Sequence, residues 1–384
     1  MKPWPILLFW SLWFVNFSTR TVLAPLLPLI EDSLSLSHGQ AGGLYTSLGL
    51  GYGISLFFAG RFASVWGHKK TVVSGFIGIA AAVFLFQWAE TYFTLLGLCF
   101  LTGVVLGTYI PSVLPIITET YDQKHWGKAI GVHDSAASFS LFTTPVLVAF
   151  GLNFFSWKIL LLFLGAAALL LPLPFWKIAE EPAPLPSEKR GNYADLFRTR
   201  TVWILGFLWI VSSAACAGIF NILPLYLVKE RGMDFEYANT LLGISRCGGI
   251  LATILFGVLC DRYGYRKILV ISILATGLGT LPIPFVHSVP WLIILLTFQA
   301  MISLGFFPLA FAALSNLTSP SERSMMVGII LALSVFFGNG VTPFLLGTIA
   351  DHYDFRAGIL GVGIVTTFSC LLVGLLKDTR GTQT

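Results

Sequence analysis

The sequence predicts an all-α polytopic membrane protein, with twelve transmembrane helices in two pseudo-symmetric six-helix bundles. The first observation is composition. Of the 384 residues, 56% are hydrophobic and 11% are charged, and the mean hydropathy is +0.83, whereas a soluble domain carries about 25% charged residues. The second is that apolar segments long enough to cross a hydrocarbon core of ~30 Å recur along the whole chain. The third is an internal repeat that divides the chain into two halves.

Twelve apolar segments of about 20 residues or more are the predicted transmembrane helices. They lie near residues 5–30, 41–64, 70–89, 92–117, 127–152, 157–176, 201–227, 236–260, 266–286, 289–315, 324–349 and 356–376. The longest polar stretch, "KIAEEPAPLPSEKRGNYADLFRTR", separates the sixth segment from the seventh. We therefore expect an N-terminal six-helix bundle over residues 1–176, a cytoplasmic linker over 177–200 and a C-terminal six-helix bundle over 201–384.

The two halves repeat each other at a constant offset. "GRFASVWGHKK" at 60–70 aligns with "GVLCDRYGYRK" at 257–267, an offset of 197 residues. "ETYDQKHWGKAIG" at 119–131 aligns with "NLTSPSERSMMVG" at 316–328, and Pro111 with Pro308, at the same offset. A duplicated six-helix unit is a transporter architecture that places the substrate site at the interface of the halves.

Basic residues orient the chain. With the N-terminus in the cytoplasm, seventeen lysines and arginines fall in cytoplasmic segments, and four fall outside: Lys158, Lys229, Arg231 and Arg356. This positive-inside bias predicts a multi-pass protein of the cell inner (plasma) membrane with both termini cytoplasmic. The first apolar segment is too long for a signal-peptide core, so no cleaved leader is expected. The five cysteines form no metal-ligand cluster, so we expect neither a metal nor another cofactor.

Two loops carry a family resemblance. "GVLCDRYGYRK" closely resembles the G-x-x-x-D-R-x-G-R-K/R loop between helices eight and nine of the major facilitator superfamily, and "ETYDQKHWGKAIG" is similar to the loop between its helices four and five. The resemblance covers essentially the whole chain and implies twelve helices, a central cavity and alternating access. The fifth helix lacks the glycine- and proline-rich signature of drug/proton antiporters, which favours an uptake symporter, exchanger or uniporter over a drug pump.

The same resemblance implies a cytoplasmic gating latch. Its expected members are Asp261, Arg262, Arg266 and Glu119. In the first half, Ser64 and Val65 stand where the acid and the base would be. We therefore expect an asymmetric latch, with Asp261 bonded across the inner face.

Two arginines lie near the middle of predicted helices, Arg20 on the first and Arg246 on the eighth. A charge at mid-membrane costs about 2.5–3.5 kcal/mol on insertion scales, and arginine cannot lose its proton. Only Asp134 is an acid well inside a predicted helix, so at least one arginine is left over. We expect both to face one central anion-binding cavity from opposite halves. The alternative is that each pairs with a carboxylate inside the protein.

Other polar side chains on predicted helices are candidates to line that cavity, and interhelical hydrogen bonding is the alternative for each. These candidates are Asn16, Tyr45, Tyr52, Tyr109, Asn221, Gln299 and Asn339. Asp134 and the adjacent His133 are the expected proton-coupling pair, because a buried carboxylate can exchange protons near neutral pH. A role of Asp134 in the latch is the competing interpretation. His38 and the remaining histidines fall in loops or at helix ends, where we expect them to be solvated.

These features together predict the substrate class. An arginine on helix one resembles the organophosphate/phosphate antiporters and the anion:cation symporters, and one on helix eight resembles the monocarboxylate and oxalate/formate porters. Ala217 and Gly49 occupy the repeat-equivalent positions of Arg20 and Arg246, so neither pattern is complete. We expect a secondary active transporter of a small organic anion, preferably a carboxylate, with a proton as a candidate co-substrate. The alternatives are an inorganic or phosphorylated anion, or a neutral solute or drug if both arginines are internally paired.

Other functional classes lack support. Neither an HExxH nor a GxSxG motif is present, so we do not expect an enzyme. The expected partners are the anionic substrate and the lipid bilayer, with no nucleic acid, and the expected state is a monomer.

Overall fold

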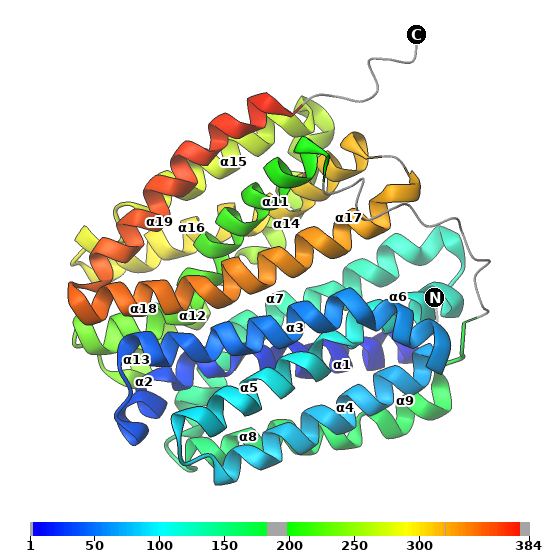
Figure 1. Cartoon of the computed structure of the whole chain (residues 1–384), viewed down its shortest axis with the longest axis horizontal. Helices are drawn as coiled ribbons and strands as arrows, with labels where there is room; N and C mark the ends of the chain where they lie inside the picture. The colour runs from blue at the N-terminus through cyan, green and yellow to red at the C-terminus, as the bar shows by residue number, and fades with distance from the viewer. Residues whose placement is uncertain (1–2, 183–197, 319, 377–384) are drawn as a thin grey trace.

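The computed structural model describes residues 3–182, 198–318 and 320–376, and these residues are almost entirely helical, with no β-strand among them. The helices form two bundles whose axes run roughly side by side (Figure 1), with α1 to α9 in one bundle and α11 to α19 in the other. This arrangement confirms the fold class that the sequence predicts. Most of the predicted linker, residues 183–197, lies outside the described residues.

The N-terminal bundle contains six membrane helices, several of them divided at a bend. The first is α1 (Pro3–Thr21) with α2 (Leu23–Leu34), and the second is α3 (His38–Trp66). The others are α4 (His68–Leu85) with η1 (Phe86–Trp88), α5 (Tyr92–Gly107) with α6 (Tyr109–Thr120), α7 (Trp126–Gly151), and α8 (Trp157–Leu170) with α9 (Pro172–Ile178). A short turn, η2 (Gln123–His125), precedes α7.

The C-terminal bundle repeats this pattern with more irregular helices. Its members are α11 (Arg200–Ser213), η3 (Ala214–Gly218), α12 (Ile219–Leu225) and η4 (Tyr226–Glu230); α13 (Phe235–Ile244) and α14 (Gly249–Tyr263); α15 (Tyr265–Thr280) and η5 (Ile283–Phe285); α16 (Val289–Leu317); α17 (Pro320–Leu333), η6 (Ser334–Val341) and α18 (Thr342–His352); and α19 (Phe355–Ser369) and η7 (Cys370–Leu375). The segments η3, η4 and η6 are π-helical. Among the described residues of the N-terminal bundle there is no π-helical segment.

Ten of these twelve helical units are long and apolar enough to cross a membrane on their own. Of the other two, α7 carries His133, Asp134 and several hydroxyl side chains, and the α13–α14 unit is interrupted at residues 245–248. Helix crosses a membrane readily because each backbone N–H and C=O is paired within the segment. Irregular backbone at this depth is therefore expected only where protein groups satisfy it.

Two loop glycines show the internal repeat in three dimensions. Gly67 joins α3 to α4 with φ 106°, and Gly264 joins α14 to α15 with φ 82°. Their positions differ by 197, the offset of the sequence repeat. Both conformations favour glycine because a Cβ atom disfavours positive φ. The loop sequences around them resemble each other for this backbone reason as well as for any role of their charges.

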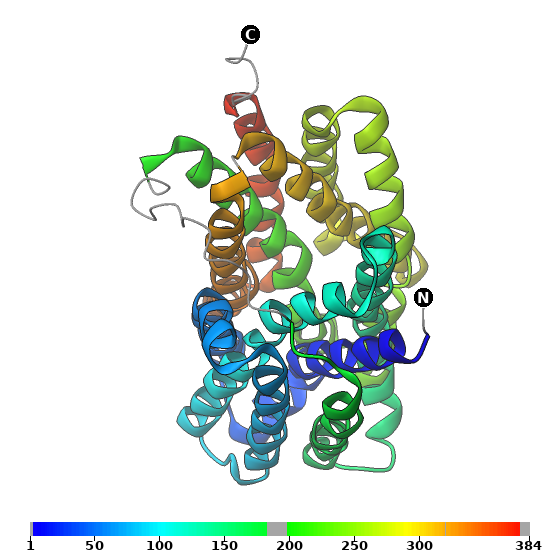
Figure 2. The same cartoon turned by 90° about the vertical axis from the view of Figure 1, so that its right-hand side faces the viewer.

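We call the end of the molecule that carries these two glycines and residues 179–182 the linker face, and the opposite end the distal face (Figure 1). Figure 2 shows the linker face, with the C-terminal bundle mostly above the N-terminal bundle. Seven hydrogen bonds between the described parts of the two bundles lie between the distal face and mid-helix. The structure is therefore closed at its distal face.

A seam of small residues closes the two bundles along α3, η6 and α18. A Cβ atom on Gly42 would lie 2.3 Å from the carbonyl oxygen of Pro343, and one on Gly347 would lie 2.2 Å from that of His38. Thr46 donates a hydrogen bond across the seam to the carbonyl of Gly340 at 3.0 Å. Helices in membranes approach this closely only where small residues line the contact.

Candidate functional site

Arg20 lies in the last turn of α1 and is half-buried. Its guanidinium carbon is 5.2 Å from the ring centre of Phe17 and 5.0 Å from that of Tyr52. It forms no ion pair among the described residues. The charge is therefore held between two aromatic rings, at partial exposure and without a counter-ion.

Arg246 occupies a different environment, although it lies at a break in its helix. The turn between α13 and α14 is tighter than an α-helix, with Arg246 N donating to the Gly243 carbonyl at 2.9 Å and Gly249 N to that of Arg246 at 3.1 Å. Arg246 is only 3% exposed, and its Nη2 donates to the carbonyl of Cys216 at 3.3 Å. Its guanidinium lies 4.8 Å from the Phe220 ring centre. Its Nε has no partner, and no carboxylate of the described chain pairs with it.

The two arginines thus differ in exposure. Arg20 is half-exposed, whereas Arg246 is buried and its Nη2 bonds to the Cys216 carbonyl of η3. Neither arginine forms an ion pair with a carboxylate of the described residues. That both face one cavity stays a prediction, because the Arg246 side chain is buried in this conformation.

Several of the predicted polar residues hydrogen-bond to the backbone of irregular helical segments. Gln299 Nε2 donates to the carbonyl of Ala215 at 2.8 Å, next to the carbonyl that Arg246 contacts, so both residues satisfy the π-helical segment η3. Asn221 Nδ2 donates to the carbonyl of Asn339 at 3.1 Å, within η6. For Gln299 and Asn221 the structure shows the interhelical hydrogen bond that was the alternative to substrate binding. π-Helical turns are frequent at functional sites.

In the N-terminal bundle, two of the candidates also bond to neighbouring helices. Asn16 Nδ2 donates to the carbonyl of Leu106 at 3.2 Å, and the Tyr109 hydroxyl donates to that of Phe9 at 3.0 Å. Three buried oxygens of the predicted site have no hydrogen-bond partner in the described structure: Asn16 Oδ1, Tyr45 Oη and Asn339 Oδ1. Tyr52 is buried and faces Arg20 through its ring.

His133 and Asp134 are adjacent in sequence but lie in different surroundings. His133 is 1% exposed, and its ring stacks at 5.7 Å on Trp13 and at 5.9 Å on Tyr109. Its Nε2 lies 3.2 Å from the Tyr109 hydroxyl, whose hydrogen goes to Phe9, so Nε2–H is the donor. Asp134 is solvent-accessible, although protein surrounds it on most sides. Of the two side chains, that of Asp134 is the more exposed.

Among the described residues, none of the predicted latch residues forms an ion pair between the bundles. Asp261 and Glu119 are exposed and form no ion pair or hydrogen bond within the described chain. Arg262 packs on Tyr263, with 5.3 Å from its guanidinium to the ring centre, and Arg266 donates to the carbonyl of Leu376 at 2.6 Å. The Asp261 latch stays a prediction for a conformation closed at the linker face.

In the first half, a carboxylate that the sequence analysis did not consider lies beside the degenerate loop. Glu181, which follows α9, accepts hydrogen bonds from the backbone nitrogens of His68 at 2.5 Å and Lys69 at 2.9 Å. It caps the positive N-terminus of α4, where a carboxylate is stabilising. Within the described residues, Ser64 bonds to the carbonyl of Arg61, in its own helix. Glu181 therefore anchors the start of the linker to the N-terminal bundle.

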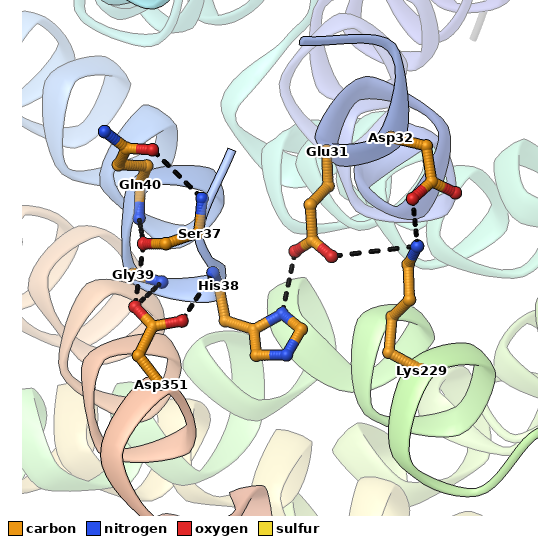
Figure 3. A network of polar contacts seen from close by, with 8 residues as sticks. All are labelled: Glu31, Asp32, Ser37, His38, Gly39, Gln40, Lys229 and Asp351. Atoms are coloured by element: carbon orange, nitrogen blue, oxygen red, sulfur yellow. Dashed lines mark hydrogen bonds and ion pairs between the residues drawn. The ribbon is translucent and has the colours of Figure 1, made fainter. Parts of the chain in front are cut away.

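A second group of residues that sequence reasoning missed joins the bundles at the distal face (Figure 3). Asp351 of α18 bonds to the start of α3, and Lys229 of η4 pairs with Glu31 and Asp32 of α2. The expectation that His38 is solvated was wrong, because its Nδ1 bonds to Glu31 Oε2 at 2.8 Å and its side chain is 28% exposed. We call these contacts the distal seal.

Known proteins resemble the chain along its length. A model of the Major Facilitator Superfamily matches residues 9–251 and 214–383. "Uncharacterized MFS-type transporter YuxJ" of Bacillus subtilis (strain 168) is 25% identical over 367 residues, covering 90% of this chain and 92% of the relative. "Multidrug resistance protein MdtG" of Salmonella heidelberg (strain SL476) is 24% identical over 381 residues, covering 94% and 92%.

Two solved structures share the fold. A bacterial homologue of the human lysosomal transporter Spinster, in an inward-facing and occupied conformation, superimposes with a TM-score of 0.82 at 16% identity, covering 98% of this chain and 97% of that one. The nucleoside transporter NupG superimposes with a TM-score of 0.82 at 14% identity, covering 97% and 100%. At these identities the likeness shows the fold alone.

Proposed function

Because the chain belongs to the Major Facilitator Superfamily, and is therefore a multi-pass membrane transporter, we propose that it moves a small organic anion by alternating access and that Arg20 binds the anion. The observation that carries the proposal is the state of Arg20, a half-exposed cation with aromatic contacts and no protein counter-ion among the described residues. The named relatives are drug or uncharacterised transporters, so the proposal of an anionic substrate is based on the geometry of the site.

The energetics favour an anionic ligand. A guanidinium near mid-membrane costs about 2.5–3.5 kcal/mol, and a cation–π contact returns about 0.5–2 kcal/mol. The rings of Phe17 and Tyr52 thus offset part of the cost without neutralising the charge of the guanidinium fork. A carboxylate fits that fork with two parallel hydrogen bonds. An organic anion also gains contact between its apolar body and the two rings, which nitrate or phosphate cannot make.

Arg246 would add a second positive charge to the site. In this conformation its Nη2 bonds to the Cys216 carbonyl, and its Nε is unpartnered. We assign it two roles, a positive potential in the centre of the C-terminal bundle and a support for η3. Direct contact with substrate would require the turn between α13 and α14 to move.

The direction in which the site opens follows from the proposed orientation. The excess of lysines and arginines on the linker face supports a cytoplasmic location of that face by the positive-inside rule. The bundles are joined at the distal face, so the structure is then the inward-facing state. Asp134, the accessible acid of α7, is the proposed carrier of a co-transported proton.

A drug carrier is the second candidate, and it rests on two observations. The MdtG relatives are multidrug resistance proteins by name, and aromatic rings line α1 and α7. Trp10 stacks on Phe14 at 5.5 Å, and both contact Phe139, at 5.5 Å and 5.9 Å. Such rings suit a large apolar ligand, and a drug carrier would not require Arg20.

Transport by purified protein in proteoliposomes tests the proposal. The substrates are a panel of radiolabelled carboxylates, phosphate, nitrate and a cationic dye, and the variants are Arg20→Gln and Arg20→Lys. We expect uptake of at least one carboxylate, lost about tenfold or more in both variants, because lysine lacks the bidentate fork. Arg61→Gln, which removes an exposed arginine near the linker face, is the matched control and should transport normally. Dye transport that survives Arg20→Gln, with no carboxylate flux, would favour the drug carrier instead.

A further inference from the structure

The distal seal contains a carboxylate that caps a helix of the other bundle. Asp351 Oδ2 accepts from the Ser37 hydroxyl at 2.7 Å and from Gly39 N at 2.9 Å, and Oδ1 accepts from His38 N at 2.8 Å (Figure 3). A carboxylate at a helix N-terminus is stabilised by the free N–H groups and the helix dipole. Opening the distal face must remove this cap from α3.

The second part of the distal seal is centred on Glu31, whose side chain is only 8% exposed. One of its oxygens lies 2.8 Å from His38 Nδ1 and the other 3.8 Å from Lys229 Nζ, and Lys229 also bonds to Asp32. His38 and Glu31 belong to the same bundle, whereas Lys229 comes from the other one. The His38–Glu31 pair can therefore persist when the bundles separate.

His38 faces the C-terminal bundle across a small cavity of about 190 Å³, and the charged groups there decide how that bundle responds to its protonation. Three carboxylates, Asp351, Glu230 and Asp354, come from α18, η4 and the residue that caps α19. Two cations, Lys229 and Arg356, are bonded to Asp32 and Glu230 respectively. The negative groups outnumber the positive ones.

Two further contacts complete the surroundings of the imidazole. The ring of Phe355 lies 5.0 Å from that of His38, within the range at which a cation is attracted to an aromatic face. His352, the other histidine nearby, bonds through Nδ1 to the carbonyl of Thr348 in its own helix at 2.9 Å. A protonated His38 is thus attracted by Asp351 and the Phe355 ring of the C-terminal bundle and repelled by Lys229, and it loses all three interactions when the bundles part.

We propose that the His38–Glu31 pair is a proton-binding site of the distal face and that proton binding there closes the distal gate. A free imidazole titrates at about pH 6.5. In acid the imidazolium adds a positive charge to a site with an excess of carboxylates and strengthens closure. At alkaline pH the neutral imidazole still bonds to Glu31, but the unbalanced carboxylates favour separation. By linkage, if His38 binds the proton more tightly in the closed state, proton binding shifts the protein toward the closed state.

The test measures the distance between the bundles in the full-length protein. Spin labels are placed at Ser33→Cys and Ser288→Cys, exposed distal positions of the two bundles that lie outside the cavity beside His38, with the five native cysteines replaced. Pulsed EPR in nanodiscs at pH 5.5–8 gives the closed and open populations without any substrate. We expect the closed-to-open ratio to be about fivefold higher at pH 5.5 than at pH 8, equivalent to about 1 kcal/mol, the upper end for such a partly exposed pair.

Two variants at His38 make opposite predictions, so a folding defect cannot imitate both. His38→Gln keeps a hydrogen-bond donor for Glu31 without a titrating group, and should behave at every pH as wild type does at pH 8. His38→Arg carries a permanent charge and should stay closed throughout. His352→Gln is the matched control and should keep the wild-type response. A pH response that survives His38→Gln, or opening on acidification, would overturn the proposal. The measurement needs no substrate, so its outcome does not depend on whether the proposed anion is transported.

Discussion

Replacing Gly347 with alanine should weaken the distal seal by overpacking. Gly347 lies on α18, where that helix crosses the start of α3. The added Cβ would lie 2.2 Å from the His38 carbonyl oxygen, 2.5 Å from its carbonyl carbon and 2.8 Å from Gly39 N. All three are backbone atoms of the other bundle. No side-chain rotation can relieve the clash, so the two helices must move apart.

The size of the effect follows from this geometry. Non-bonded heavy atoms make favourable van der Waals contact from about 3.5 Å, so the helices must separate by about 1 Å at this point. Overpacking of this kind typically costs about 1–3 kcal/mol, which lowers the closed-to-open ratio about 5- to 150-fold. The cost falls on the closed state alone, because the contact exists only between the bundles. Separation would also lengthen the hydrogen bonds from Asp351 to the α3 N-terminus.

The assay is the same inter-bundle EPR distance at one pH, with Gly361→Ala as the matched control. Gly361 also lies in a helix of the C-terminal bundle, and an added Cβ there would meet no atom within 4 Å. Gly347→Ala should shift the population toward the long distance, and Gly361→Ala should leave it unchanged. Equal distance distributions in the two variants would refute the reasoning, because the seam would then not be what holds the distal face closed.

Three further predictions concern other parts of the chain. Asp134→Asn should abolish the accumulation driven by an inward proton gradient while leaving counterflow of substrate intact. Accumulation that persists in proteoliposomes would assign the proton to another residue. Gln299→Leu leaves the Ala215 carbonyl of η3 without its donor, and should cost about 1–3 kcal/mol, seen as a lower midpoint of thermal unfolding. An unchanged midpoint would mean that η3 needs no such support. Asp261→Asn should alter cysteine accessibility at the linker face more than Ser64→Ala does, and equal effects would argue against an asymmetric latch.

The sequence by itself determined the membrane class, the twelve helices and their repeat. Backbone groups in hydrocarbon must pair within the segment, so a run of apolar residues of membrane length can form little else than helix. The repeat was readable because the two loop glycines share a backbone conformation at the same offset, Gly67 with φ 106° and Gly264 with φ 82°. The two mid-helix arginines were also identifiable, since a charge that costs several kcal/mol in a membrane marks a special position.

Only the tertiary structure decided how those charges are used. Arg20 and Arg246 are equivalent in a hydropathy plot, yet one lies half-exposed between rings and the other supports an irregular helix. That irregularity cannot be predicted from local sequence, because the side chains that bond to the carbonyls of η3, Gln299 and Arg246, come from other helices. The distal seal could not be predicted from the sequence for a similar reason. His38 and Asp351 are 313 residues apart, and they meet only when the two bundles close against each other.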